Sequence, residues 1–209
     1  SLTTDGQLHA HKVASGDAQE KTILADKAEN NELWSFIAPH VLANLQGMYP
    51  DNQMSLADGA VIVKDTFYER DLAQAKAGGT NAGAEYRSVL VASGGQAGGF
   101  YYALDVTDPY KPKFLWQISR SDKGEPLFGD QAGAPAITTL AVKDGKQVKE
   151  VAVAIRPGGT STPVKGACKS NRKSTNFAHI DSTYKPRTQV QCWSKGPGRS
   201  VTIVRLDTG

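Results

Sequence analysis

Short stretches of β-branched and aromatic residues, each bounded by turn residues, recur along the chain. Runs of about four to eight such residues are typical of β-strands. Only one stretch has the spacing of an amphipathic helix. The sequence predicts strands in the following ranges, in chain order: 5–13, 32–36, 60–63, 86–92, 99–107, 114–118, 135–140, 148–154 and 200–209. We therefore expect an all-β chain.

One strand–turn unit occurs three times, in 5–13, 99–107 and 200–209. Each copy has a glycine or small residue, then a short strand, then a polar turn. In the first two copies a second strand follows, in which a tryptophan comes directly after a leucine (Trp34 and Trp116). The third copy reaches Asp207-Thr208-Gly209, where its tryptophan strand would be due. The unit recurs at intervals of about 95 to 100 residues, which indicates a repeat architecture.

The order of the strands indicates the kind of repeat. Residues 60–118 contain four consecutive strands, residues 134–209 contain three, and residues 1–36 contain two. A four-stranded meander is one blade of a β-propeller. We predict that residues 1–209 are part of a single β-propeller domain, a quinoprotein-dehydrogenase-like fragment of about two to three blades. Because so few blades cannot close a ring, we expect the remaining blades elsewhere in a longer protein.

One short helix is expected after the first tryptophan strand. Pro39 is compatible with a first helical turn, where its missing N–H is harmless. Ile37, Val41, Leu42 and Leu45 follow the helical spacing and place apolar side chains on one side. The helix is expected to pack on the core or to cap a blade edge.

The basic residues are concentrated in one loop. The net charge of the whole chain is +3. Residues 160–200 alone carry eight Lys and Arg against one Asp, a net +7, so the remainder is −4. The range 156–200 is rich in Pro, Gly, Ser, Thr and Lys, and we interpret it as a basic, cysteine-bearing loop insertion. Its candidate partner-binding residues are Lys169, Arg172, Lys173, Lys185 and Arg187.

Two interpretations of the basic loop stay open. It is either a solvated, variable insertion, or it contacts anionic polysaccharide, lipid headgroups or an acidic partner. Nucleic acid is not expected as a partner, because the loop has few aromatic side chains, among them Tyr184 and Trp193, that could interleave with bases.

Both cysteines, Cys168 and Cys192, lie in the same loop. Two cysteines in a long polar segment are typical of a disulfide formed in an oxidising compartment. Closing the ring of 25 residues would remove roughly 3 kcal/mol of unfolded-state entropy in the simple chain model. Two unrelated reduced thiols are the alternative. A zinc site is disfavoured because His179 is the one nearby histidine, which leaves the ligand set one short.

Little in the sequence points to catalysis. His9 and His11 are two residues apart on one strand and so face the same side, but no third metal ligand is identifiable. Ser93 and Asp105 lie in turns of the repeated unit, which favours a structural role. The glycine run 94–99 joins two strands without a following helix, so phosphate binding is disfavoured. We expect no enzyme and no cofactor in this fragment.

Three motifs resemble one known family. They are Asp5-Gly6-Gln7-Leu8-His9-Ala10, then Glu32-Leu33-Trp34-Ser35-Phe36, and then the stretch from Arg87 through Gly99-Phe100-Tyr101-Tyr102-Ala103-Leu104-Asp105 to Pro109, followed by Leu115-Trp116. Over roughly residues 5 to 140, the chain resembles the PilC/PilY-type proteins, which are type IV pilus tip-associated adhesins and biogenesis proteins.

The chain departs from that family at three places. Tyr86 stands where the family usually has tryptophan. Arg156-Pro157 stands where a Gly-Asn-Gly-Tyr-like turn is expected. The alternating aspartate loop that binds calcium in the family is absent, so calcium binding by a full-length family member would lie elsewhere.

The resemblance implies a function in type IV pilus biogenesis and surface adhesion, performed by binding and not by catalysis. It implies an extracytoplasmic location: the pilus tip, the outer cell surface or the periplasm. The implied partners are minor pilins or the pilus tip complex, and a host or abiotic surface. A periplasmic scaffold propeller in envelope assembly is the first alternative. The second is a quinoprotein dehydrogenase, which usually needs adjacent cysteines, whereas Cys168 and Cys192 are 24 positions apart.

The disulfide prediction is directly testable. Mass spectrometry of a non-reduced proteolytic digest of the secreted protein should contain a peptide pair linked through Cys168 and Cys192, which reduction separates. Two free thiols in that sample would contradict both the disulfide and the secreted location.

Overall fold

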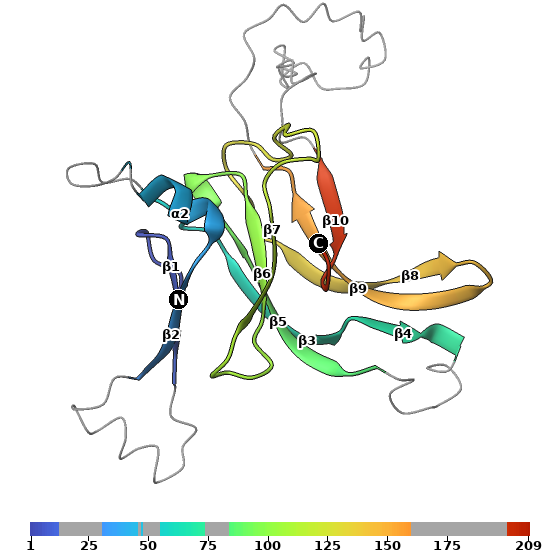
Figure 1. Cartoon of the computed structure of the whole chain (residues 1–209). Coiled ribbons are helices and arrows are strands. Elements are labelled where there is room, and N and C mark those ends of the chain that lie inside the picture. Colours follow the sequence, from blue (N-terminus) through green and yellow to red (C-terminus); the bar gives the residue numbers. More distant parts are fainter. Residues whose placement is uncertain (13–30, 46, 48–54, 74–83, 160–199) are drawn as a thin grey trace, which may run out of the picture.

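The computed structural model describes residues 1–12, 31–45, 47, 55–73, 84–159 and 200–209. These residues form mostly β-strands with one short α-helix, in agreement with the predicted all-β class. The strands make three antiparallel groups, which we call the N-terminal hairpin, the central sheet and the C-terminal sheet (Figure 1). Among the described residues, no helix is long and apolar enough to cross a membrane.

The central sheet is a four-stranded meander. Its strands are β3 (Val61–Phe67), β5 (Tyr86–Ser93), β6 (Tyr101–Asp105) and β7 (Lys113–Ile118), and they pair in that order. All three pairings are antiparallel. The four strands that the hydrophobic pattern predicts in residues 60–118 are therefore present and adjacent.

The C-terminal sheet contains three predicted strands and one unpredicted strand. The predicted strands are β8 (Ala136–Asp144), β9 (Gln147–Pro157) and β10 (Val201–Arg205). β9 pairs with β8 on one side and with β10 on the other. Because β9 extends to Pro157, its last two residues overlap the start of the expected loop 156–200.

The unpredicted strand is β4 (Glu69–Asp71), which pairs with residues 149–151 of β9. Its sequence is charged throughout and carries no strand pattern, so its conformation comes from the pairing with β9. Since β4 follows β3 after a single residue, one continuous segment belongs to both sheets (Figure 1).

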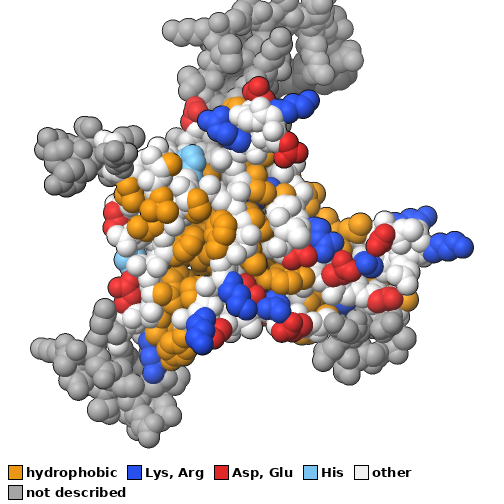
Figure 2. Space-filling model, in the orientation of Figure 1, with side chains coloured by type: hydrophobic (Ala, Val, Ile, Leu, Met, Phe, Trp, Pro, Cys, Tyr) orange, Lys and Arg blue, Asp and Glu red, His pale blue; other side chains and the backbone are white. Residues whose placement is uncertain are grey.

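The N-terminal hairpin consists of β1 (Gln7–His11) and β2 (Glu32–Ile37) and is followed by α2 (Pro39–Leu45). Val41 of the helix is buried, whereas Leu42, which was expected in the apolar stripe, is 54% exposed. Exposed hydrophobic side chains also include Tyr110 and Phe114 near and on β7. Figure 2 shows hydrophobic side chains gathered over the hairpin, α2 and β7.

The central sheet is buried on both faces. Successive residues of β5 and β6 alternate between two hydrophobic cores, as the two-residue period of a strand requires. The core toward the C-terminal sheet contains Val89, Val91, Tyr101 and Ala103. The core toward the N-terminal hairpin and α2 contains Leu90, Ala92, Tyr102 and Leu104. A strand buried on both faces needs a continuous apolar run, which is the pattern of both segments.

The internal repeat is confirmed by strand register. Ala10 pairs with Trp34 in the hairpin, and Ala103 pairs with Trp116 in the central sheet. A register shift follows each of the two alanines. The two segments thus share not only sequence but the position of their cross-strand pair and bulge.

Each tryptophan also contacts the next layer. The indole N–H of Trp34 donates to the carbonyl oxygen of Pro109, in the β6–β7 turn, at 2.8 Å. The indole N–H of Trp116 donates to the carbonyl oxygen of Leu206, after β10, at 2.9 Å. Buried indole N–H groups require such partners. The repeated tryptophan therefore connects hairpin to central sheet and central sheet to C-terminal sheet.

Replacing these tryptophans should destabilise the fold unequally. Trp116→Phe removes a buried hydrogen bond and part of the packing, so we expect the free energy of unfolding to fall by about 1 to 3 kcal/mol. Trp34→Phe removes an exposed hydrogen bond and should cost less. Urea denaturation followed by circular dichroism measures both. Equal losses would contradict the proposed difference in burial.

Candidate functional site

The residues predicted to bind a partner lie outside the described residues. This holds for Lys169, Arg172, Lys173, Lys185 and Arg187, and for the predicted disulfide partners Cys168 and Cys192. Their pairing and partner contacts stay predictions. The described residues contain two other features of interest, which are a cleft and a buried arginine.

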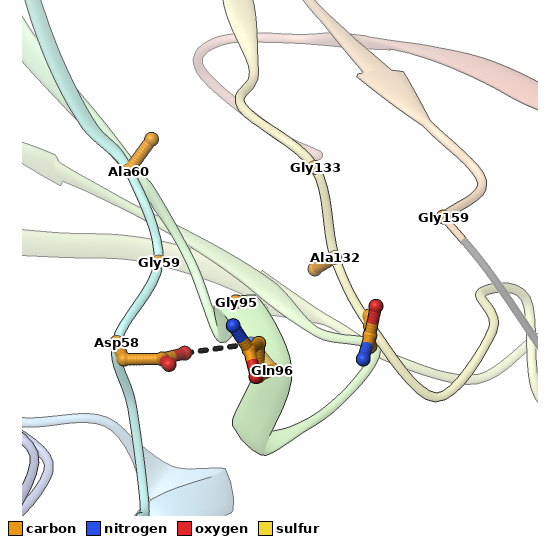
Figure 3. A pocket seen from close by; sticks show the side chains of 9 residues that line it. Asp58, Gly59, Ala60, Gly95, Gln96, Ala132, Gly133 and Gly159 are labelled. Atoms are coloured by element: carbon orange, nitrogen blue, oxygen red, sulfur yellow. Dashed lines mark hydrogen bonds between the residues drawn. The ribbon is translucent and has the colours of Figure 1, made fainter.

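The cleft lies where the ends of the central and C-terminal sheets meet (Figure 3). It has a volume of about 310 Å³. Four parts of the chain contribute: the segment before β3, the β5–β6 connection, the segment before β8 and a residue after the end of β9. The lining residues are Asp58, Gly59, Ala60, Gly95, Gln96, Gln131, Ala132, Gly133 and Gly159.

Glycines are required in this cleft because backbones touch there. A Cβ at Gly59 would lie 2.1 Å from the carbonyl oxygen of Ser93. A Cβ at Gly159, which has a φ of +78°, would lie 1.7 Å from the carbonyl oxygen of Gln131. Positive φ and close backbone approach both select glycine. Much of the cleft wall is therefore backbone without side chains, and neighbouring backbone segments pack directly against one another.

The carboxylate of Asp58 accepts a hydrogen bond from the glycine-rich loop 94–99. Residues Gly95–Ala97 form a single 3₁₀ turn, and the backbone N–H of Gln96 donates to Oδ1 of Asp58 at 2.6 Å (Figure 3). A phosphate would have to compete with Asp58 for this N–H group. Asp58 thus engages one backbone N–H group of the glycine-rich loop.

The polar side chains that line the cleft can form hydrogen bonds. Its polar side chains are Asp58, Gln96 and Gln131. The nearby Ser93 is fully buried, and its hydroxyl oxygen accepts the backbone N–H of Ala60 at 3.1 Å. Within the described ranges, no three His, Cys, Asp or Glu side chains are placed to hold a metal ion.

Asp105 stabilises the turn after β6, as the sequence indicates. Its Oδ1 accepts the backbone N–H of Thr107 at 3.0 Å, and its Oδ2 accepts N–H of Arg87 at 2.9 Å and the hydroxyl of Tyr68 at 3.2 Å. Burial raises the pKa of Asp105, but the hydrogen bonds from Thr107, Arg87 and Tyr68 outweigh it and hold the pKa below its usual value. The ionised carboxylate thus stabilises the fold above about pH 4, and this stabilisation is lost at lower pH.

Three histidines, His9, His11 and His40, lie among the described residues, whereas His179 lies outside them. His9 and His11 lie on one side of β1 with ring centroids 6.0 Å apart, as their spacing predicts. Nδ1 of His9 contacts the carboxylate of Glu32 at 2.7 Å. His40 packs on Phe100 at 4.5 Å, and burial lowers the pKa of His40.

Arg156 is the feature that the sequence interpretation missed. Its side chain is fully buried, and its guanidinium lies 5.6 Å from the ring centroid of Tyr101, 5.3 Å from that of Trp116 and 5.2 Å from that of Phe128. Among the residues that the structure describes, none of its three side-chain nitrogens has a hydrogen-bond acceptor. Burial lowers the pKa of Arg156 to about 10.

The position of Arg156 could have been found from the sequence. Ala152, Ala154 and Arg156 are two residues apart, so they share one face of the strand, and both alanines are in the core between the sheets. The Pro-Gly-Gly that follows made Arg156 look like the first residue of a loop. Extending the alternation by one step identifies it as an inward-facing side chain.

Comparison with known proteins found a structural likeness. The chain matches no family model and no curated protein. It is similar to the crystal structure of the Pseudomonas aeruginosa PilY1 C-terminal domain, with 23% identity and a TM-score of 0.43. The match covers 77% of this chain and 25% of that chain. A likeness at this level assigns neither a family nor a function.

The buried charge of Arg156 leads to an unusual mutational prediction. An unpaired buried cation costs more than its contacts with aromatic rings return, at about 0.5 to 2 kcal/mol each. We expect Arg156→Met, which keeps most of the volume, to leave the free energy of unfolding unchanged or to raise it by about 1 to 3 kcal/mol. Thermal and urea denaturation measure this change.

Arg156→Ala is the matched control, because it removes the charge but also leaves a cavity, and it should lower the stability. If Arg156→Met destabilised the protein as strongly as Arg156→Ala, the guanidinium group would have to make a favourable polar interaction, and the unpaired state would be wrong.

Proposed function

We propose that this chain is a non-catalytic binding module that acts in type IV pilus biogenesis and surface adhesion, outside the cytoplasm. The observation that carries the proposal is the motif from Arg87 to Pro109 with Leu115-Trp116, which resembles the PilC/PilY-type proteins. In the structure this motif is the core of the central sheet, so its apolar residues are explained by burial. The pilus-related function itself rests on the sequence resemblance.

The proposed architecture is part of a β-propeller. Three observations support it: the central sheet is a four-stranded meander, its two faces are covered by other strands, and the same Ala–Trp pair recurs in two hairpins. In a propeller, consecutive blades pack face to face around a ring. The N-terminal hairpin, the central sheet and the C-terminal sheet would be consecutive blades, and the remaining blades of the same propeller would complete the ring.

A role in binding agrees with the hydrogen bonding of the buried and partly buried polar side chains. The carboxylates of Asp58 and Asp105 and the hydroxyl of Ser93 accept backbone N–H groups that shape turns and chain contacts. Side chains engaged in this way are poor candidates for nucleophiles or general bases. We propose that the chain needs no cofactor of its own.

The proposed contact surface for partners is the basic loop. Its cations would attract an anionic polysaccharide on a host or abiotic surface, or an acidic face of a minor pilin in the tip complex. The loop carries a net +7 on a chain that is otherwise negative, so attraction to anionic surfaces would be local to it.

Charge reversal tests the proposal. A variant with all five candidate residues changed to Glu (Lys169, Arg172, Lys173, Lys185 and Arg187) should reduce adhesion of piliated cells to an anionic polysaccharide surface by about tenfold, because attraction becomes repulsion. Piliation should persist. The measurement is a count of adherent cells, with pili quantified by electron microscopy.

Five exposed lysines outside the loop provide the matched control: Lys111, Lys113, Lys123, Lys143 and Lys146. Changing them to Glu alters the net charge equally and should leave adhesion unchanged. If both variants lose adhesion equally, the loop has no special role. If deletion of the whole protein leaves both pili and adhesion intact, the pilus-related function is wrong.

A further inference from the structure

Two histidines, His9 and His11, lie side by side on the outer face of the N-terminal hairpin. Leu8, between them and the start of β1, belongs to the core toward the central sheet. Since successive residues of a strand face opposite ways, both histidines face away from that core. Their rings are nearly parallel, with an interplanar angle of 15° and centroids 6.0 Å apart. His11 is exposed and the side chain of His9 is 21% exposed, so solvent reaches both.

The internal repeat indicates that the fold does not require histidine at these two positions. Counted from the alanine that lies opposite each repeated tryptophan, His9 corresponds to Tyr102 and His11 to Leu104. Tyr102 and Leu104 are both buried in a hydrophobic core. The hairpin thus has two imidazoles where the equivalent strand of the central sheet has two packed apolar side chains. Packing among the described residues does not account for this pair.

Glu32 sets the tautomer of His9. It lies opposite His11 in the strand register, and its Oε1 is 2.7 Å from Nδ1 of His9. A carboxylate only accepts hydrogen bonds, so Nδ1 carries the hydrogen of this contact, and in the neutral imidazole Nε2 keeps its lone pair. Histidines that bind metal ions commonly donate their other ring N–H to a carboxylate in this way. Glu32 therefore prepares His9 to coordinate an ion through Nε2.

We propose that His9 and His11 together bind one divalent transition-metal cation of the kind that prefers imidazole ligands, such as Zn²⁺. Imidazole suits Zn²⁺, Cu²⁺ and Ni²⁺, whereas Mg²⁺ and Ca²⁺ prefer oxygen ligands. With Zn–N bonds of about 2.1 Å, two imidazoles on one tetrahedral ion have centroids about 5 Å apart. The two rings have to approach by about 1 Å, which rotation of the exposed His11 side chain between its allowed conformations supplies.

The chain supplies two ligands to this site. Within the described ranges, no three His, Cys, Asp or Glu side chains are placed on one ion, and Glu32 acts through its hydrogen bond to His9. Water completes the coordination, so the affinity is expected to be lower than that of a structural zinc site with four protein ligands. The inference goes beyond the proposed function, because the ion has no part in catalysis, in the basic loop or in the stability of the cores.

Zinc titration tests the site. Isothermal titration calorimetry of the purified 209-residue chain at neutral pH should show one Zn²⁺ bound through the pair. His9→Ala and His11→Ala should each weaken binding at least tenfold, with an unchanged circular dichroism spectrum, because one ligand of two is lost. In ¹⁵N NMR spectra of the imidazoles, added Zn²⁺ should shift Nε2 of His9 while Nδ1 stays protonated. Unchanged affinity in both alanine variants would overturn the inference.

Two controls separate this site from other zinc ligands of the chain. His40→Gln replaces a histidine that packs on Phe100 and should leave the zinc affinity unchanged. Cys168→Ser, Cys192→Ser and His179→Ala, combined in one variant, remove the cysteines and the histidine of the basic loop and should also leave it unchanged. If this combined variant abolishes zinc binding, the ion binds at the loop and the proposed site is wrong.

Glu32→Gln tests the positioning residue. It keeps the size of the side chain but removes the carboxylate, so we expect one Zn²⁺ to bind still, about tenfold more weakly. Loss of Nδ1 protonation of His9 in the NMR spectrum should accompany the weaker binding. A purely structural role for Glu32 would instead lower the midpoint of urea denaturation and leave the zinc affinity as it is, and that result would overturn the role assigned to Glu32.

Discussion

Burial of both faces of the central sheet is the constraint on which the structure depends. Along β5 and β6, alternate residues face the C-terminal sheet, and the residues between them face the N-terminal hairpin and α2. A sheet with two apolar faces cannot be stable in water alone, because each face must be covered by another layer. The indole N–H groups of Trp34 and Trp116 make this packing specific, because each donates a hydrogen bond to one backbone carbonyl oxygen of the next layer.

Much of the fold follows from local patterns. The strands and the short helix were predictable because apolar alternation and turn residues act over a few positions. The repeat was predictable because Leu33-Trp34 and Leu115-Trp116 are distinctive pairs. Strand β4 was not predictable, because its charged sequence adopts strand geometry only through its pairing with β9.

In the candidate site, too, the features that depend on contacts between distant segments were not predictable from the sequence. The turn function of Asp105 could be read from its sequence neighbourhood, since Thr107 is only two residues away. The cleft could not, because Asp58, Gly95 and Gln131 come together only when two sheets pack. Arg156 is an intermediate case: alternation places it inside, but nothing local shows that three aromatic rings from other segments surround it.

The segment that runs from β3 into β4 has a mechanical consequence. Its first part is hydrogen-bonded into the central sheet and its second part into the C-terminal sheet, with Tyr68 as the single intervening residue. Tyr68 is itself held by Asp105. A pulling force on either sheet is therefore transmitted along covalent backbone to the other, and hinge motion between the two would have to break the β4–β9 pairs first. The short connection through Tyr68 thus couples the two sheets mechanically.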